Sequence, residues 1–288
     1  MRSAPWLVHM RLPFSIRQIV TVVGAAVAVL ACGLAAHALW GTAGLAAPIA
    51  LSVLAVLLFV LESRDHQHRL FLRTLQEQRS MYTQLEALQH VIRATEPIAP
   101  LPAMRSWAAS PDLLRELVAR ILAEKPTQVV EASSGVSTLV IAYCLKRLGR
   151  GKVRSLEHDP IYAARTRQLI TEHGLGAFAE VIDAPLVEQR ADGAMLRWYD
   201  CSKAGLAGPI DLLVVDGPPD TTGPQARYPA LPLLKHLLAP GSLVVLDDGG
   251  RDDERFIAKR WADLVPGAEL RYLELEAGAW MLRLPPGR

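Results

Sequence analysis

The pattern of apolar and polar positions divides the chain into an N-terminal apolar part and a longer mixed part. From Gln18 to Leu61, 44 residues pass without one Asp, Glu, Lys or Arg. At about 1.5 Å of rise per residue, a helix of this length is roughly 66 Å long, which is about two crossings of a ~30 Å hydrocarbon core. Residues 41–44, Gly-Thr-Ala-Gly, are typical of a turn. The sequence therefore predicts a transmembrane helical hairpin over residues 18–61, after a tail of residues 1–17.

The apolar stretch has two alternative interpretations, a signal peptide and a buried hairpin. A signal peptide has an apolar part of only about 7 to 15 residues, so the stretch is too long for one. A buried hairpin inside a soluble fold would need every face of both helices covered. The three arginines of the tail and the arginines after residue 62 predict that both ends face the cytoplasm, at the inner membrane. The isolated Cys32, Cys144 and Cys201 agree with a reducing compartment.

The segment 62–94 changes to a helical pattern with charged positions. Its apolar stripe consists of Phe71, Leu75, Tyr82, Leu85, Leu88 and Ile92, with Gln78 among them. We expect a juxtamembrane helix that either forms a parallel coiled coil, making a homodimer through residues 70–92, or packs against its own chain. Residues 95–104 contain three prolines in their first eight positions and predict an extended linker.

Residues 105–288 alternate short apolar runs with helical patterns, which is typical of an α/β fold with a mainly parallel sheet and helices on both faces. Seven strands are predicted, at residues 128–132, 153–157, 179–182, 211–216, 242–247, 269–273 and 280–284. Helices are predicted from residue 111 to about 125, and at 137–148, 160–173, 229–238 and 253–264. From residue 62 onward the chain has 28 basic and 29 acidic residues. This near-neutral balance argues against a nucleic-acid partner.

The first strand of this domain is followed by a loop of small residues. Glu131-Ala-Ser-Ser-Gly-Val-Ser-Thr138 joins an apolar strand to a helix start, where free N–H groups can bind a polar or anionic ligand. The loop is neither a P-loop nor a three-glycine dinucleotide motif. The second strand ends at Glu157, where an acid can accept both hydroxyls of a ribose. Together the two signals predict a nucleotide-type site; a plain turn and a solvated strand end are the alternatives.

At this point the chain resembles the class I S-adenosylmethionine-dependent methyltransferases. The resemblance covers about residues 105–288 and is carried by residues 131–138, 156–160, 211–219 (Asp-Leu-Leu-Val-Val-Asp-Gly-Pro-Pro), 227–231 (Arg-Tyr-Pro-Ala-Leu) and 240–248. It implies a Rossmann-like, seven-stranded methyltransferase sheet with S-adenosylmethionine as cofactor. The implied cofactor-binding residues are Glu131, Ser133, Ser134, Gly135, Thr138, Glu157, His158, Asp183 and Ala184. Ser133 stands where the family motif has its first glycine.

Three acids suggest the chemistry of the site. Asp216 ends the fourth strand and Asp247 and Asp248 end the fifth, so they are expected to converge at one sheet edge. Clustered carboxylates repel one another unless a cation or a proton lies between them. All three acids are therefore candidate ligands of Mg²⁺. Alternatively, Asp216 is a general base and the other two cap a helix. Asp216 and His158 are the candidates for proton transfer, and Lys203 and Arg227 for binding an anionic acceptor.

The sequence thus predicts a membrane-anchored methyltransferase that methylates oxygen of a small-molecule, saccharide or lipid-linked acceptor. One alternative is a membrane scaffold or binding protein that retains the fold without catalysis. Another is a nucleotide-sugar or nicotinamide-dependent Rossmann enzyme, against which the missing three-glycine motif argues.

Overall fold

The computed structural model describes residues 16–42, 46–105, 108–202, 204–206 and 208–287. Two compact units are present, Met1–Glu77 and Gln78–Arg288, and each is described by itself. The predicted tail of residues 1–17 lies almost entirely outside the described residues, as does Lys203.

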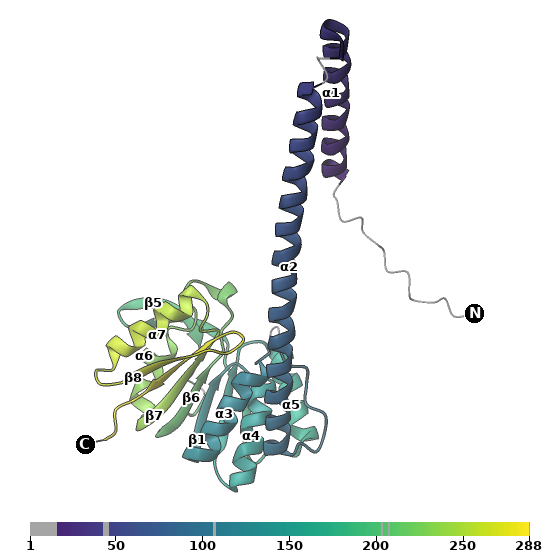
Figure 1. Cartoon of the computed structure of the whole chain (residues 1–288). Helices are drawn as coiled ribbons and strands as arrows, with labels where there is room; N and C mark the ends of the chain where they lie inside the picture. The colour runs from purple at the N-terminus through teal and green to yellow at the C-terminus, as the bar shows by residue number, and fades with distance from the viewer. Residues whose placement is uncertain (1–15, 43–45, 106–107, 203, 207, 288) are drawn as a thin grey trace. The chain divides into compact units, whose positions relative to one another are not determined.

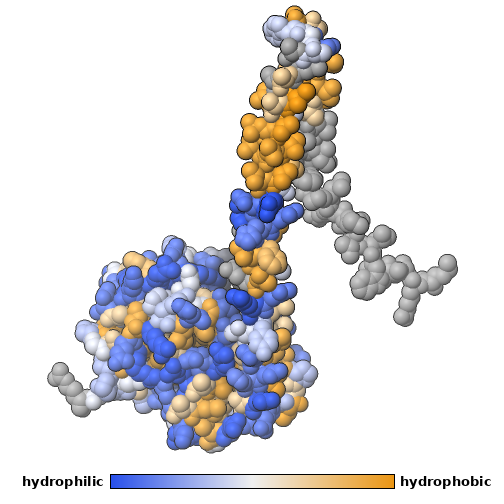
Figure 2. Space-filling view, viewed as in Figure 1, coloured by the Kyte–Doolittle hydropathy of each residue, from blue (hydrophilic) through white to orange (hydrophobic). Residues whose placement is uncertain are grey.

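The first unit contains helix α1 (Ile16–Trp40) and the N-terminal part of helix α2 (Ala46–Thr95). These two segments lie side by side (Figure 1), and a Cβ built on Gly33 would lie 3.9 Å from the Pro48 Cβ. Apolar side chains on both helices are exposed, among them Leu34 and Leu57, and Figure 2 shows them gathered along α2. Within the part of the chain that the structure describes, no helix is both long and apolar enough to cross a membrane.

The predicted second span and the predicted juxtamembrane helix are one continuous helix, α2, because no Pro or Gly interrupts the sequence between Ala50 and Thr95. In the second unit its last turns bury Gln84, Ala87, Val91 and Thr95. These residues recur at steps of three and four and form one face. This face is not the predicted stripe: Tyr82, Leu85 and Ile92 stay exposed.

The second unit is built on a seven-stranded sheet with the order β3-β2-β1-β6-β7-β9-β8. The strands are β1 (Gln128–Ala132), β2 (Lys152–Glu157), β3 (Ala179–Asp183), β6 (Ile210–Val215), β7 (Leu238–Asp247), β8 (Glu269–Leu273) and β9 (Ala279–Arg283). The first five pair in parallel, whereas β9 is antiparallel to β7 and to β8. The carboxyl ends of the five parallel strands therefore share one edge.

Helices cover both faces of this sheet, as predicted. They are α3 (Pro111–Glu124), α4 (Val136–Leu148), α5 (Pro160–Glu172), α6 (Ala230–Leu234) and α7 (Asp252–Leu264), with short 3₁₀ turns at Asp220–Thr222 and Lys235–Leu237. Neighbouring strand residues point to opposite faces, so Val129 packs with α3 and α4, and Val130 packs with α6 and α7. Each face thus has its own apolar core.

The helix starts follow from local side-chain chemistry. Asp159 caps α5: its Oδ1 accepts the Ile161 N–H at 2.8 Å, and Pro160 fixes the first helical φ. At α3 the residue before the helix makes no such cap, because the Ser110 hydroxyl donates to Asp112 Oδ1 at 2.6 Å instead of accepting a backbone N–H. Asp112 is buried and also accepts the Glu276 N–H at 2.8 Å.

A β-hairpin was missed by the sequence analysis. Strands β4 (Leu186–Ala191) and β5 (Ala194–Tyr199) pair antiparallel around a tight turn at Asp192-Gly193, where both residues have positive φ. The Asp-Gly pair is a hairpin signal. The hairpin ends at Tyr199, which is buried with Trp198 in the core on the α6/α7 face. Both rings are therefore core residues.

Candidate functional site

The candidate site lies at the shared carboxyl edge of the parallel strands. β1, β2 and β3 bring Glu131, Glu157 and Asp183 to this edge. β7 ends at Asp247, and Asp216 directly follows β6. In open α/β sheets a ligand binds at this edge, next to the point where the strand order reverses, which here lies between β1 and β6.

Glu131 is fully buried at the end of β1. Its Oε2 accepts hydrogen bonds from the hydroxyls of Thr138 and Ser155, each at 2.6 Å. Burial raises the pKa of Glu131, against the effect of these hydroxyl donors. Its Oε1 has no hydrogen-bond partner in the described part of the chain. One oxygen of the buried Glu131 carboxylate therefore lacks a hydrogen-bond donor within the described residues.

The loop after β1 takes a conformation that is unusual for its sequence. Ser133 has a φ of +112°, a region that favours glycine. This is the position at which the related motif has glycine, so the fold keeps the glycine conformation although the residue is serine. The Gly135 N–H donates to Thr138 Oγ1 at 3.1 Å at the start of α4.

Ser134 joins the two loops of the predicted cofactor site. Its hydroxyl donates to Glu157 Oε2 at 2.9 Å, so the loop after β1 contacts the acid that ends β2. The other oxygen, Oε1, accepts the N–H groups of His158 at 2.9 Å and Asp159 at 3.0 Å. Glu157 is thus held in one orientation by three donors. The His158 ring packs edge-on against Tyr199 at 5.9 Å between centroids.

The end of β3 lies beside this pair. Asp183 pairs with Glu157 in the parallel register, and the Ala184 N–H donates to the Glu157 carbonyl at 2.8 Å. The Asp183 carboxylate is exposed and lies 2.7 Å from Arg167 Nη2, whereas Ala184 is buried. The structure therefore brings all predicted cofactor residues to one side of the strand-order reversal.

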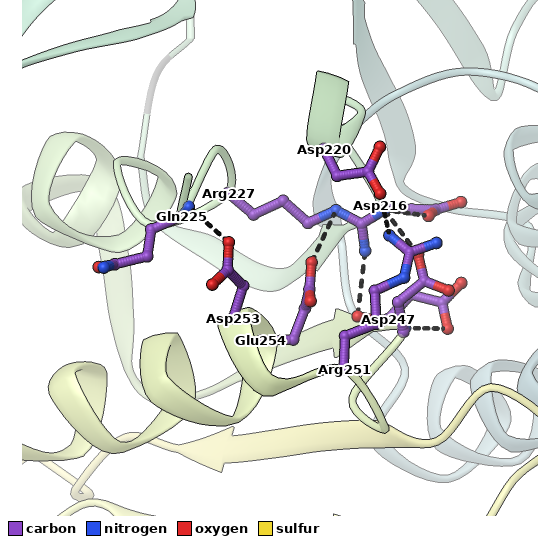
Figure 3. Close-up of polar contacts among 9 residues, drawn as sticks. Asp216, Asp220, Gln225, Arg227, Asp247, Arg251, Asp253 and Glu254 are labelled. Carbon is purple, nitrogen blue, oxygen red and sulfur yellow. Dashed lines mark hydrogen bonds and ion pairs between the residues drawn. The ribbon is translucent and has the colours of Figure 1, made fainter. Parts of the chain in front are cut away.

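The acids after β6 and β7 converge, as predicted, but around an arginine (Figure 3). Arg227 is buried, and its Nη2 lies 2.8 Å from Asp248 Oδ2 and 3.3 Å from Asp216 Oδ1. Its Nη1 donates to the Asp247 carbonyl at 3.0 Å, and its Nε lies 3.8 Å from Glu254 Oε1. Arg227 is therefore not a surface group poised for an anionic acceptor, since carboxylates already surround it.

This arrangement does not support the predicted magnesium site at Asp216, Asp247 and Asp248. No group of three or more His, Cys, Asp and Glu side chains among the described residues is placed to hold a metal ion. The physical reason lies in the charges: the cation between Asp216 and Asp248 is the Arg227 guanidinium, and Asp247 Oδ1 accepts the Asp248 N–H at 2.7 Å.

Burial dominates the electrostatics of these acids. Loss of solvent raises the pKa of Asp216 to about 7, although the positive charge of Arg227 acts in the opposite direction. Burial likewise raises the pKa of Asp247 well above its usual range, and the nearby Asp216 adds to this effect. An aspartate with a pKa near neutrality can accept a proton and release it again at physiological pH.

The cis-peptide Gly217-Pro218 follows Asp216 directly. A Cβ built on Gly217 would overlap the Tyr199 hydroxyl oxygen and would lie 3.2 Å from both the Ala132 carbonyl oxygen and Ser133 Cβ. The loop after β6 thus packs closely against the loop after β1, with Tyr199 between them.

An apolar groove of about 800 Å³ opens elsewhere on the same unit. It is lined by Leu85, Leu88 and Ile92 of α2 and by the proline-rich segment 97–104. Its two main polar side chains are already engaged, since the Gln84 amide oxygen accepts the Asp112 N–H and Arg105 pairs with Glu276.

Backbone contacts tie this groove to the carboxyl edge of the sheet. The Glu276 N–H donates to Asp112, at the start of α3, next to the groove. The next two carbonyls, of Ala277 and Gly278, accept the N–H groups of Gly250 and Gly249 at 2.9 and 2.8 Å. Because these glycines follow the acids at the end of β7, one short loop separates the groove from the acidic cluster.

Comparisons with known proteins bear on the fold and on the class of domain. Residues 132–249 match the model of a family described as a methyltransferase domain. A methyltransferase of Podospora anserina, solved with SAH bound, is similar with a TM-score of 0.51, covering 73% of this chain and 95% of that one at 18% identity. The O-methyltransferase of Bacillus cereus in complex with SAH gives 0.46, covering 69% and 90% at 18% identity. No curated protein matches the sequence. Residues 132–249 thus resemble a methyltransferase domain, and the second unit has the Rossmann-like fold of the Podospora anserina methyltransferase.

Sequence reasoning missed two parts of the site. Glu254 was read only as part of a helix, yet it is buried beside Arg227. The sequence predicts Arg227 as a candidate for binding an anionic acceptor, whereas the structure buries it among carboxylates. Two signals pointed to the burial of Arg227. It precedes a Tyr-Pro turn and the apolar run Ala230–Leu234. In addition, four acids at strand ends and in the first turn of α7 required a positively charged partner.

Proposed function

We propose that this protein is an S-adenosylmethionine-dependent methyltransferase that methylates an oxygen of its acceptor. The observation that carries the proposal is the contact of Ser134 with Glu157, which joins the ends of β1 and β2 at the strand-order reversal. The fold and the family match support the same class.

In this proposal each strand end contacts one part of the cofactor. Glu131, Ser133, Ser134, Gly135 and Thr138 bind the amino acid part, for which Glu131 Oε1 is a suitable acceptor of ammonium N–H groups. Glu157 binds the ribose hydroxyls, with His158 beside it. The segment Asp183-Ala184 binds the adenine.

S-adenosylmethionine supplies an activated methyl group on a sulfonium, so the protein must mainly align the acceptor and remove its proton. Asp216 is the proposed proton acceptor, because burial places its pKa near neutrality. His158 is the second candidate, and it packs against the buried Tyr199 ring, which fixes its orientation. The tight packing at Gly217 holds the Asp216 loop against the cofactor loop.

We propose an acceptor with an aliphatic part, such as a lipid-linked molecule. The apolar groove supports this, because it lies one loop away from the acidic cluster, and the Gln84 amide oxygen and the Arg105 guanidinium in its lining are paired. A fluorescent fatty acid added to the full chain is expected to bind, and Leu88→Glu to weaken binding at least about tenfold through a buried charge. Tyr82→Glu, on the same helix outside the groove, is the control. Equal binding by both variants argues against the groove.

We also propose that residues 18–61 anchor the chain to the inner membrane, with the N-terminus and the methyltransferase domain in the cytoplasm. The uncharged sequence and the exposed apolar side chains of α1 and α2 support this. We further propose a homodimer through residues 70–92. The apolar side chains of Tyr82, Leu85 and Ile92 on α2 are exposed and could pack against a second copy of the helix.

The deciding experiment is calorimetric titration of S-adenosylmethionine into the full chain in mild detergent. We expect micromolar binding, lost in Glu157→Gln because the neutral side chain no longer offers two acceptor oxygens. Glu188→Gln, an exposed carboxylate on β4, is the matched control. A folded chain that does not bind would favour the scaffold alternative. Binding of a nicotinamide or sugar nucleotide instead would favour the other enzyme class.

A further inference from the structure

The acidic cluster contains its own permanent cation. Arg227 is only 4% exposed, yet its guanidinium lies within 4 Å of the side chains of Asp216, Asp248 and Glu254 and binds the Asp247 carbonyl. A guanidinium keeps its charge at any physiological pH. A buried arginine in such a cluster is stable only because the acids compensate its charge.

The same contacts occupy the carboxylate oxygens that a hard divalent ion would need as ligands. Mg²⁺ requires near-octahedral oxygens at about 2.0–2.1 Å and is repelled by a cation at that distance. Here Asp248 Oδ2 and Asp216 Oδ1 both face Arg227 Nη2, and Asp247 Oδ1 accepts a backbone N–H. A second arginine, Arg251, lies 3.1 Å from Asp248 Oδ2 on the solvent side.

We infer that Arg227 is the resident counter-ion of this cluster and that the centre formed by Asp216, Asp247 and Asp248 binds no divalent metal ion. The statement on metal binding holds whether or not the protein transfers methyl groups. Its consequence for the acceptor rests on the proposed function. A centre without metal has no ion to chelate two adjacent hydroxyls, so an acceptor with one nucleophilic oxygen suffices.

The test is a titration of Mn²⁺, a spectroscopic substitute for Mg²⁺, with the full chain in mild detergent, followed by electron paramagnetic resonance of the free ion. Wild type is expected to bind no Mn²⁺ at this cluster. Arg227→Met removes the charge while keeping much of the volume, and is expected to bind one Mn²⁺ at least about tenfold more tightly than wild type. Arg251→Met is the control, because it also removes a cation next to Asp248 but leaves Arg227 in place.

Three results would overturn the inference. The first is tight Mn²⁺ binding by wild type that Asp216→Asn abolishes. The second is an Arg227→Met variant that is folded by circular dichroism and still binds no Mn²⁺, since the arginine would then not be what excludes metal. The third is an equal gain in Arg251→Met. If Arg227→Met does not fold, the wild-type titration decides alone: binding lost in Asp216→Asn overturns the inference, and absence of binding supports it.

Discussion

Ser133 combines an L-residue with a backbone conformation that favours glycine, directly at the proposed cofactor site. The φ of +112° costs a non-glycine residue about 1–3 kcal/mol. Such strain persists only where surrounding contacts fix the loop, and here the loop after β6 packs against it at Gly217. The strain is therefore part of the site and not of a free surface turn.

We expect Ser133→Gly to raise the free energy of unfolding by roughly 1 kcal/mol, because the relief of strain exceeds the entropy that glycine adds to the unfolded chain. Urea unfolding measures this. Ser134→Gly is the control with the opposite sign, since it removes the hydrogen bond to Glu157 without relieving a positive φ. A loss of stability in Ser133→Gly would show that the serine side chain makes a contact worth more than the strain.

Asp216 gives the proposed reaction its pH dependence. Its pKa of about 7 reflects burial, together with Asp248 and Glu131, against the charges of Arg227 and Arg251. Below this pKa the carboxyl is protonated and cannot accept a proton, so the methylation rate should rise with pH through about 7. A pH–rate profile of wild type and Asp216→Asn measures this, and an unchanged profile in the variant would exclude Asp216 as the base.

The same group makes a prediction for stability. A carboxyl whose pKa is raised on folding loses its proton more easily in the unfolded chain. Its favourable contribution is complete below the unfolded pKa, near 4, and is lost as pH rises through about 7. We therefore expect the stability difference between Asp216→Asn and wild type to shift in favour of the variant from pH 5 to 8, measured by urea unfolding. A difference that does not change with pH would contradict the raised pKa.

For single residues, the sequence predicted where the acids of the site and the loop of small residues after β1 lie, because strand ends and loops follow from the hydrophobic pattern. It predicted Glu131, Glu157, Asp216 and Asp247 at one edge. It could not predict the partner of the acids, because Arg227 comes from a loop between β6 and α6 whose path depends on tertiary packing.

Among the elements, α3 is fixed by one buried side chain. Asp112 accepts hydrogen bonds from Ser110 Oγ, from its neighbour's N–H and from Glu276 N–H, so it joins the helix start to the loop before β9. We expect Asp112→Ala to lower the free energy of unfolding by about 1–3 kcal/mol, because buried donors lose their acceptor. Asp252→Ala is the control.

Asp252 also lies in a first helical turn, that of α7, but its side chain is 96% exposed and its ion pair with Arg255 is on the surface. Its removal should cost no more than about 0.5 kcal/mol. Thermal or urea unfolding of both variants distinguishes them. Equal effects would mean that the Asp112 contacts contribute little.

The seven strands of the sheet and the helices around them were predictable, because the central strands β1, β6 and β7 are buried on both faces and give continuous apolar runs, and the helices have amphipathic periods. The β4–β5 hairpin was not, because its strands mix exposed Glu188 with buried Ala191 and Trp198 and show no regular alternation. The stripe on α2 was visible in the sequence. Which face packs on the domain was decided by small and polar residues such as Ala87 and Thr95, which hydropathy does not single out.

At the scale of the whole molecule, the proposed membrane anchor can be tested by fractionation. The full chain expressed in a bacterium is expected to stay in the membrane fraction after an alkaline carbonate wash and to be released by detergent, because the proposed anchor would bury the apolar side chains of residues 18–61 in lipid. Leu54→Lys with Leu57→Lys should release most of the chain. Tyr82→Lys with Ile161→Lys, at exposed positions of the second unit, should not. Release of the wild-type chain by carbonate would exclude an integral anchor.

The crowding at Gly217 has a consequence for the history of this chain. Since a Cβ at 217 would overlap the Tyr199 hydroxyl oxygen, a side chain at 217 requires a change at 199. Among descendants of the same ancestor, a residue larger than glycine at 217 should occur only where 199 has lost its hydroxyl or its ring. The loop after β1, the loop after β6 and the β4–β5 hairpin pack together at this point. Related sequences are therefore expected to show covariation between positions 199 and 217.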